Sequence, residues 1–449
     1  MTAPCSGPRY VRGCVAHAPS RGSIELLEDA FLSIDPSTGR IDAFHPEIQP
    51  SDLLLLSNAR SSDVLHLPNG QFLVPGFVDT HVHAPQFPYM GTATDVPLMQ
   101  WLDKYTFPVE RSFEDPTVAT EWYSKLLDSM LREGITTAQY FATIHVDATK
   151  ILADLVELRG QRGLVGLVSM DRNAPESYVS SSTDKCLAEA EEFIVYALSK
   201  GNELVKPVVT PRFVPTCSLE LMKGLGALAT KYNVHVQSHI AESKDEEAFV
   251  ETLHPGRRDT ELFDEAGLLT EKSCMAHAVH LRDEELGVLH RTGTAIACCP
   301  LSNFFFANGF LDVRKVLNNG MDVGLGTDIA GGYSPSMLRA IQTCVLTIKA
   351  LEIQEGTSGA PTQPFDFKDA FWLATMGGAK ALQLENDTGS FAVGKCFDAI
   401  LVDVHRGHNL VFSERDTPMD IFQKVIHNAD NRNFAKVFVK GKVVHENTV

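Results

Sequence analysis

The chain has 449 residues, which is more than one small domain needs and enough for a large barrel with an appended smaller domain. Hydrophobic residues make up 44% and charged residues 21% of the chain, a composition that excludes an intrinsically disordered protein. The net charge of −18 and the lack of a lysine- or arginine-rich run argue against a nucleic-acid partner.

The N-terminal segment and the cysteines indicate the compartment. Residues 1–22 lack the apolar stretch of a signal peptide, and no run of 18 apolar residues predicts a membrane span. The nine cysteines are scattered and contain no C-x-x-C pair, so free thiols are expected and a thiolate-based metal site is not. These features predict a cytoplasmic protein without a membrane partner.

Residues 1–74 contain short β patterns, such as 23–35 and 71–76, but they are too few to form a stable hydrophobic core of their own. Residues 388–449 contain two more, at 394–403 and 435–444. The two flanks are therefore predicted to pair into one small β-sandwich domain built from both termini.

Between these flanks, residues 75–387 alternate short β-rich runs with amphipathic helical patterns. The predicted strands are 77–83, 136–143, 163–170, 205–213, 234–242, 273–279, 294–300 and 322–328. Eight strands alternating with helices predict an α/β fold, a (β/α)8 TIM-like barrel, with catalytic groups at the C-terminal strand ends. The alternative is a doubly wound open sheet, although no G-x-G-x-x-G or P-loop follows any strand.

The clearest helical patterns lie at 120–134, 219–232, 283–293 and 336–353. Ser334 is predicted to cap the last of these helices, with Pro335 in its first turn.

The first barrel strand ends in an H-x-H motif, His81 and His83, whose side chains share one face of the strand. Taken alone, the motif fits a hydrogen-bonded pair of core histidines as well as half of a metal site. Three further strands also end in polar groups: His239 on the fifth, His277 on the sixth and Asp328 on the eighth. Their convergence on one barrel end predicts a metal site with nitrogen and oxygen ligands.

Nine segments spread over nearly the whole chain resemble the amidohydrolase superfamily and, within it, the guanine deaminase family. They are PGFVDTHVHAPQFPYMG, DVPLMQWLDKYTFP, TTAQYFATIH, VTPRF, QSHIAE, MAHAVHL, GLGTDIAGGYSPSML, ATMGGAKAL and GSFAVGKCFDAILVD. The H-x-H and GTD elements identify the superfamily, whereas Gln86, Arg212-Phe213 and WLDKYTFP carry the purine-specific resemblance. Leu301 stands where relatives usually carry a polar residue.

The resemblance implies a metal-dependent hydrolase that converts guanine to xanthine and ammonia. The implied metal ligands are His81, His83, His239 and Asp328, which would hold one Zn²⁺ per chain, with iron or cobalt as alternatives. Relatives with two metals carry a bridging lysine at the end of the fourth strand, where this chain has Arg212.

Three implied catalytic residues are Glu242, Asp328 and His277. Glu242 would carry the water proton to the substrate, Asp328 would aim the water, and His277 would donate to the developing oxygen. The implied substrate-binding residues are Gln86, Arg212, Phe213, His239, Glu242 and Asp328.

Two other functions remain open from the sequence. The same ligands serve enzymes that deaminate or dechlorinate triazines, cytosine or adenine-like rings, and some barrel relatives without a metal act as scaffolds. Trp101 and Tyr105 fit either a pocket cover or core packing. A homodimer is expected because symmetric dimers are the commonest assembly.

Overall fold

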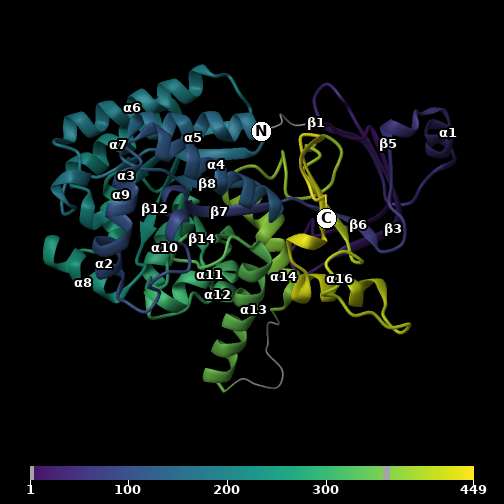
Figure 1. Ribbon diagram of the computed structural model, residues 1–449. Helices are drawn as coiled ribbons and strands as arrows, with labels where there is room; N and C mark the ends of the chain where they lie inside the picture. The colour runs from purple at the N-terminus through teal and green to yellow at the C-terminus, as the bar shows by residue number, and fades with distance from the viewer. Residues whose placement is uncertain (1–4, 357–364, 449) are drawn as a thin grey trace.

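The computed structural model describes residues 5–356 and 365–448. Its strands form two sheets, one built around the barrel and one built from both ends of the chain (Figure 1). The barrel sheet is parallel, with eight strands following one another in chain order and a short ninth strand beside the fourth. Its strands are β7 (Phe77–His83), β8 (Ile135–Phe141), β9 (Arg162–Gly166), β10 (Val168–Ser169), β11 (Val205–Pro211), β12 (His235–Ile240), β13 (Ser273–His277), β14 (Ala295–Cys298) and β15 (Val323–Leu325). The predicted (β/α)8 barrel is confirmed.

Helices cover the outside of the barrel strands (Figure 1). The helices around the barrel include α4 (Pro116–Arg132), α5 (Val146–Arg159), α6 (Thr183–Ser199), α7 (Leu219–Tyr232), α8 (Lys244–Leu253), α9 (Asp259–Glu265), α10 (Asp283–Thr292) and α13 (Met337–Gln354). The remaining helices are α1 (Pro50–Asn58), which lies beside β5 away from the barrel in Figure 1, α2 (Leu98–Trp101), α3 (Phe107–Ser112), α11 (Pro300–Ser302), α12 (Val313–Asn318), α14 (Phe367–Trp372), α15 (Gly378–Ala381) and α16 (Pro418–Asn428). Short 3₁₀- or π-helical segments are η1 (Ser61–Asp63), η2 (Ala84–Tyr89), η3 (Leu102–Thr106), η4 (Glu176–Tyr178), η5 (Val214–Thr216), η6 (Asn303–Ala307), η7 (Leu373–Gly377) and η8 (Asn431–Asn433).

Local sequence signals fix where the barrel helices begin and end. Asp115 caps α4 by accepting a hydrogen bond from Thr117 N, and Pro116 occupies its first turn. Gly293 ends α10 in a left-handed conformation, with φ of 74°, that a β-carbon would disfavour. Gly293 thus ends α10 two residues before β14 begins at Ala295.

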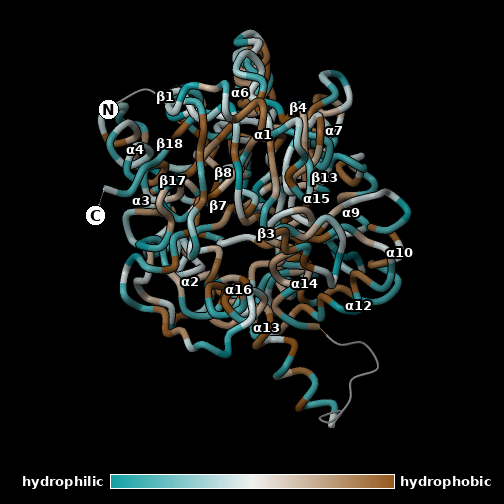
Figure 2. The backbone as a smooth tube through the Cα atoms, turned by 90° about the vertical axis from the view of Figure 1, so that its right-hand side faces the viewer, coloured by the Kyte–Doolittle hydropathy of each residue, from teal (hydrophilic) through white to brown (hydrophobic). Residues whose placement is uncertain are grey.

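The predicted start of α13 is wrong by two residues. Ser336, not Ser334, occupies the capping position, and the helix begins at Met337. Ser336 is extended, with ψ of 116°, and its N–H donates to the Ser334 hydroxyl oxygen. The serine–proline pair therefore forms a turn ahead of the helix. Figure 2 shows hydrophobic and hydrophilic residues alternating along α13, as expected for a helix with one buried face.

The second sheet joins the two ends of the chain, which lie side by side in Figure 1. Its strands are β1 (Cys5–Ser6), β2 (Tyr10–His17), β3 (Glu25–Ile34), β4 (Ile41–His45), β5 (Val64–His66), β6 (Gln71–Pro75), β16 (Ala399–Asp403), β17 (Phe434–Val439) and β18 (Lys442–Glu446). The antiparallel pairing of β6 with β16 links the N-terminal strands to the C-terminal ones. Strands from both termini share one hydrophobic core, which includes Val15, Leu32, Leu73, Leu401 and Phe438.

A buried ion pair ties the second sheet to the barrel. Arg162, the first residue of β9, donates to Asp398 just before β16, with Nη2 and Oδ2 3.1 Å apart. The second oxygen of Asp398 accepts from the backbone N–H of Lys440. Both side chains are almost fully buried, so water cannot solvate either charge if the other one is removed.

We expect Asp398→Ala to lower the free energy of unfolding by about 3–5 kcal/mol, because it leaves the Arg162 charge buried without its partner. Urea denaturation followed by circular dichroism measures this loss. Asp63→Ala is the control: it removes an ion pair with Arg60, whose side chain is 83% exposed, and should leave the unfolding free energy nearly unchanged. Equal effects of the two changes would contradict a stabilising role for the Arg162–Asp398 pair.

Among the residues that the structure describes, no helix combines the length and the apolar character needed to cross a bilayer.

Candidate active site

The polar strand ends meet at the C-terminal end of the barrel, where catalytic groups of this fold lie. β7 brings in His81 and His83, β12 brings in His239, and β13 ends at His277. Asp328 follows β15 by three residues. All five side chains are buried.

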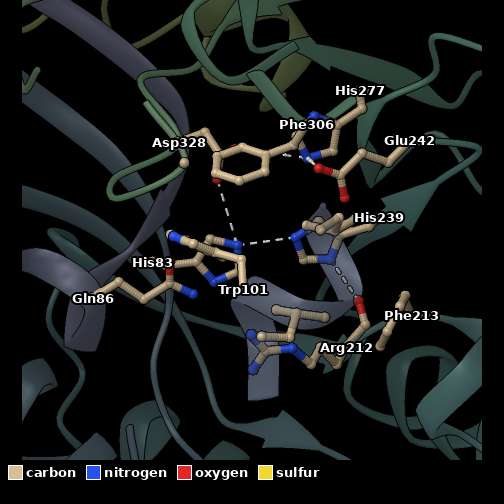
Figure 3. A pocket seen from close by; sticks show the side chains of 13 residues that line it. His83, Gln86, Trp101, Arg212, Phe213, His239, Glu242, His277, Phe306 and Asp328 are labelled. Carbon is tan, nitrogen blue, oxygen red and sulfur yellow. Dashed lines mark hydrogen bonds and ion pairs between the residues drawn. The ribbon is translucent and has the colours of Figure 1, made fainter. Parts of the chain in front are cut away.

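The ring nitrogens and the carboxylate of this cluster face one another at short range. Nε2 of His83 and Nε2 of His239 lie 2.9 Å apart, and Asp328 Oδ1 lies 3.2 Å from His81 Nε2 and 3.6 Å from His83 Nε2 (Figure 3 shows His83, His239 and Asp328). His239 Nδ1 donates to the backbone oxygen of Arg212 at 2.6 Å. That hydrogen bond fixes the tautomer and leaves the lone pair of His239 Nε2 directed into the cluster.

The cluster fits a divalent metal ion. His81 Nε2 is buried and makes no hydrogen bond within the described residues, although Asp328 Oδ1 is 3.2 Å away, and buried polar atoms normally have a partner. Burial lowers the pKa values of His81, His83 and His239, which favours the neutral imidazoles that bind metals. Three imidazoles and one carboxylate are a ligand set suited to zinc or iron.

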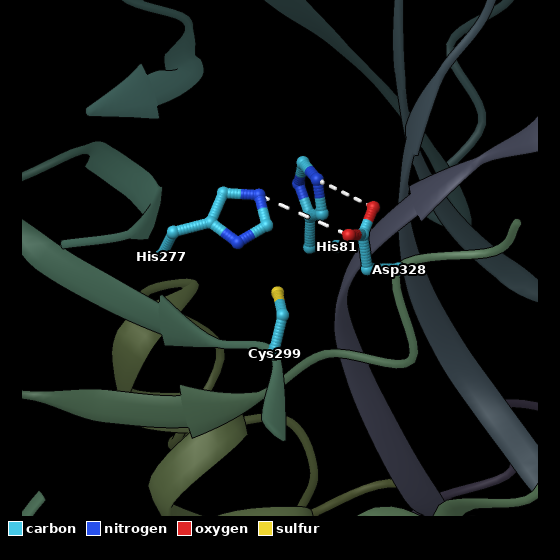
Figure 4. Close-up of side chains that lie close together, drawn as sticks. All are labelled: His81, His277, Cys299 and Asp328. Atoms are coloured by element: carbon cyan, nitrogen blue, oxygen red, sulfur yellow. Dashed lines mark ion pairs between the residues drawn. The ribbon is translucent and has the colours of Figure 1, made fainter. Parts of the chain in front are cut away.

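A cysteine also adjoins the cluster, which the sequence pattern did not predict. Cys299, just after β14, directs its sulfur toward the space beside His81, His277 and Asp328 (Figure 4). Burial raises the pKa of the Cys299 thiol well above its usual value, and the thiol form is a poor ligand. The thiol also has close neighbours, since a β-carbon at Gly326 would lie 3.0 Å from its sulfur. Gly326 thus leaves the room that His81 and Cys299 occupy.

Backbone contacts close the barrel at the cluster of histidines and Asp328. Asp328 N donates to His81 O at 2.9 Å, and His83 N donates to Ile329 O at 3.0 Å. Asp328 and His277 have φ values of 49° and 73°, a left-handed conformation that side chains other than glycine rarely adopt. Such strain is typical of functional sites, where the surrounding fold holds a residue in place.

Glu242 lies on the other side of the cluster, beside His277 (Figure 3). Its carboxylate Oε1 is 3.7 Å from His277 Nε2, and the side chain is buried. Burial, followed by the nearby charge of Asp328, raises the pKa of Glu242 well above its usual value. A carboxyl group with a raised pKa can take up and release a proton near neutral pH, as a general acid–base group must.

His277 is held by a hydrogen bond on its far side. Its Nδ1 lies 3.0 Å from Asn303 Oδ1 and donates to it, since a carbonyl oxygen only accepts. Nε2 therefore donates only when the ring is protonated. Burial lowers the pKa of His277, whereas Asp328, 3.9 Å from Nε2, raises it.

A pocket opens beside the cluster, with about 410 Å³ of empty space including its solvent-filled mouth. Gln86 and Arg212 lie at its lower side in Figure 3, and Trp101 lies in front. The remaining wall residues are His83, Leu98, Leu102, Phe213, His239, Glu242, His277, Phe306, Asp328 and Gly331. The Trp101 ring packs against Phe306, with ring centroids 4.8 Å apart. A pocket whose wall combines aromatic and aliphatic side chains with several polar groups suits an aromatic heterocycle.

The sequence profile of the Amidohydrolase family matches residues 72–444. This chain belongs to the amidohydrolase family. A guanine deaminase from Dictyostelium discoideum is 42% identical to it, over 97% of this chain and 98% of the relative. The human guanine deaminase is 39% identical, over 96% of each chain. A solved guanine deaminase from C. acetobutylicum, with guanine bound, superposes with a TM-score of 0.89 at 31% identity, over 97% of this chain and 100% of that one.

These comparisons confirm the resemblance found in the sequence. The structure also brings every candidate residue of the sequence analysis to one end of this amidohydrolase's barrel. Trp101 lines the pocket, whereas the Tyr105 ring packs 6.4 Å from that of Tyr89. Leu301 is buried in α11, where an apolar side chain is suited to its surroundings.

Three polar residues that hold the amidohydrolase site together were not singled out by sequence patterns. Asp79 shares a strand face with His81 and accepts hydrogen bonds from Thr327 N at 2.9 Å and Thr327 Oγ1 at 2.6 Å. Burial raises the pKa of Asp79 to about 7. Asn303 fixes His277, and Glu110 contacts Arg212. The sequence signals are weak: Glu110 comes two residues after WLDKYTFP, and Asn303 lies within CPLSNF.

Proposed function

We propose that this amidohydrolase hydrolyses guanine to xanthine and ammonia. The observation that carries the proposal is the placement of a metal-binding cluster and a buried Glu242 in the same pocket as Arg212 and Gln86. The identity to guanine deaminases over nearly the full chain supports the same substrate. Triazine hydrolases share the fold at 20% identity, which does not favour a triazine substrate.

An absorbance assay that follows guanine disappearance, with and without a chelator, tests this function. Adenine, cytosine and ammeline serve as competing substrates. We expect guanine to be the preferred substrate and the chelator to stop its turnover. A protein that deaminates one of the other rings faster than guanine would contradict the proposal.

We propose that one divalent metal per chain, zinc or in its place iron or cobalt, is held by His81, His83, His239 and Asp328. A metal held by such ligands lowers the pKa of a bound water from about 15.7 towards about 7, which supplies a nucleophile at neutral pH. The neutral rings and the Asp328 carboxylate described above fit this role. Metal analysis of the purified protein identifies the ion.

The protons of the reaction are assigned to Glu242. Its carboxylate accepts a proton from the attacking water and passes it to a ring nitrogen, and a later transfer protonates the departing amine. The water oxygen forms a bond to C2 of guanine as the ring nitrogen takes up the first proton, which makes C2 tetrahedral. The proton of the new hydroxyl group is the one that the amine takes up. The bond from C2 to the exocyclic nitrogen then breaks as the C2–oxygen double bond forms, so xanthine and ammonia account for all atoms. Asp328 accepts a hydrogen bond from the water and fixes its direction. His277, in its protonated form, donates to the oxygen on which negative charge develops.

Substrate recognition is assigned to Arg212, Gln86 and Phe213. Arg212 is buried, and Nη1 and Nη2 each direct one N–H to Glu110. Its remaining N–H groups are proposed to donate to the two acceptors of guanine on that side, O6 and N7. Gln86 both donates and accepts, as the lactam edge requires. Phe213, at the pocket wall, offers its ring for stacking.

We expect Arg212→Lys to lower kcat/KM for guanine by about 10- to 100-fold while metal content stays the same. Lysine keeps a positive charge beside Glu110, but its ammonium group cannot replace the several coplanar N–H donors of the Arg212 guanidinium. A lost hydrogen bond from a charged donor has an effect of this size. Steady-state kinetics and metal analysis of the two proteins give the comparison.

Arg159→Lys provides the matched control for that change. Arg159, the last residue of the outer helix α5, makes two hydrogen bonds to Asp128 of α4, far from the chemistry, and should tolerate lysine without a kinetic effect. Near-normal guanine kinetics in Arg212→Lys would show that the fork of Arg212 does not bind the substrate.

We also propose that the enzyme is a homodimer of the cytoplasm. The eight cysteines whose side chains the structure describes are all free, which supports a reducing compartment. Closed two-fold dimers are the commonest assemblies of soluble enzymes. Analytical ultracentrifugation of the metal-loaded enzyme measures the mass, and a monomer at micromolar concentration would contradict the dimer.

A further inference from the structure

A fully buried carboxylate lies behind the substrate side of the pocket. Glu110, in α3, has no solvent-exposed surface and accepts four hydrogen bonds. Two come from Arg212, Nη1 at 2.6 Å and Nη2 at 3.1 Å. The third comes from Gln86 Nε2 at 2.9 Å and the fourth from the Tyr178 hydroxyl at 2.8 Å. Two of its three partner residues thus belong to the proposed substrate-binding set.

These contacts fix the orientation of both side chains. Two parallel bonds to one carboxylate hold the Arg212 guanidinium in a defined plane, which also lies over the Phe107 ring at 5.3 Å. Gln86 gives one N–H to Glu110, while its Oε1 accepts from Ala330 N at 3.2 Å. The Gln86 amide is therefore held from both ends and cannot turn over to exchange its donor and acceptor atoms.

Glu110 also balances the charge of Arg212. Both side chains are at least 97% buried, so water cannot compensate either charge. Burial opposes the charged form of Arg212, but Glu110 outweighs it and raises the pKa of Arg212. A buried cation without this partner would attract anions into the pocket, whereas a balanced pair offers oriented N–H donors without net charge.

We propose that Glu110 is a positioning residue for substrate selection: through Arg212 and Gln86 it presents fixed donors to an uncharged purine base. The inference rests on guanine deamination being the function of this site. Glu110 does not line the pocket, so it acts only through the two side chains that do.

The test is Glu110→Gln in the metal-loaded enzyme. All four groups that contact Glu110 donate hydrogen bonds. The NH₂ group of the glutamine would therefore face at least one of these donors instead of accepting from it. The substitution also removes the negative charge that balances Arg212. We expect kcat/KM for guanine to fall about 10- to 100-fold, mainly through a higher KM, with metal content unchanged. Steady-state kinetics and metal analysis give the readouts. Glu133→Gln, a buried glutamate bonded to Asn431 far from the pocket, is the matched control and should keep wild-type kinetics.

A double-mutant cycle with Arg212→Met separates positioning from a general structural role. When Arg212 is already absent, Glu110→Gln should change kcat/KM by less than about threefold, since only Gln86 remains for Glu110 to act through. An equal loss in both backgrounds would overturn the proposal, because a structural defect does not depend on Arg212. If Glu110→Gln does not fold, Glu110→Asp takes its place in the same cycle, as its shorter carboxylate keeps the charge but not the reach.

The two hypotheses fail in different ways. A metal-loaded wild-type enzyme that does not turn over guanine would overturn the function and the role of Glu110 together. An active wild type whose Glu110→Gln variant stays within threefold of it would overturn the role of Glu110 alone.

Discussion

His239→Gln should remove both the metal and the activity of this enzyme, with guanine turnover falling more than about 100-fold. Losing a residue that only supports a metal ligand already lowers affinity or activity by about 10- to 100-fold, and losing the ligand itself should do more. Glutamine lacks the ring nitrogen that His239 directs into the cluster beside His83. Metal content per chain and kcat for guanine are the measurements. Alanine at His81 or His83 should have the same effect.

His235→Gln is a closely matched control. His235 lies on the same strand, β12, and its Nε2 is 3.1 Å from the backbone oxygen of Leu382, well away from the cluster. Glutamine can keep that hydrogen bond, so metal content and turnover should stay close to wild type. A fully active, metal-free His239→Gln enzyme would refute the metal site, and equal metal loss in both variants would point to general damage of the strand.

The barrel and the meeting of the polar strand ends were predictable because their signals are local. A strand can be recognised from a short run of residues with high β propensity between two turns. Residues two apart on such a strand share one face. That rule alone placed His81 and His83 together. The barrel then placed His239, His277 and Asp328 beside them, because parallel strands end on the same side of the sheet.

The partners of these residues were not predictable because their contacts are distant in the chain. Glu110 meets Arg212 across 102 residues, and Arg162 meets Asp398 across 236. In the sequence, Glu110 reads as an ordinary charged residue of a short helix, and only tertiary packing buries it. The start of α13 was misjudged for a related reason: a serine–proline pair fits a helix cap and a separate turn equally well, and the fold selects the turn.

Glu242→Gln should keep the metal and the fold but lower kcat for guanine by about 10² to 10⁴, the usual contribution of a general acid–base group. Glutamine matches the shape of the glutamate but cannot take up a proton. In the wild type the carboxylate must be ionised to accept the water proton, so kcat/KM should fall as the pH drops through the pKa of Glu242. Because burial raises that pKa, the fall should begin at a higher pH than an exposed glutamate would give.

The pH profile of kcat/KM, measured for both proteins, gives a second readout of Glu242, since the variant should lose this acid limb. Glu251→Gln, an exposed position on the neighbouring helix α8, is the control and should match the wild type in rate and profile. If Glu242→Gln turned over guanine within a few-fold of wild type, or kept the same acid limb, Glu242 would not be the proton carrier. Asp328, which lines the same pocket as Glu242 and is also buried, would then have to accept the water proton.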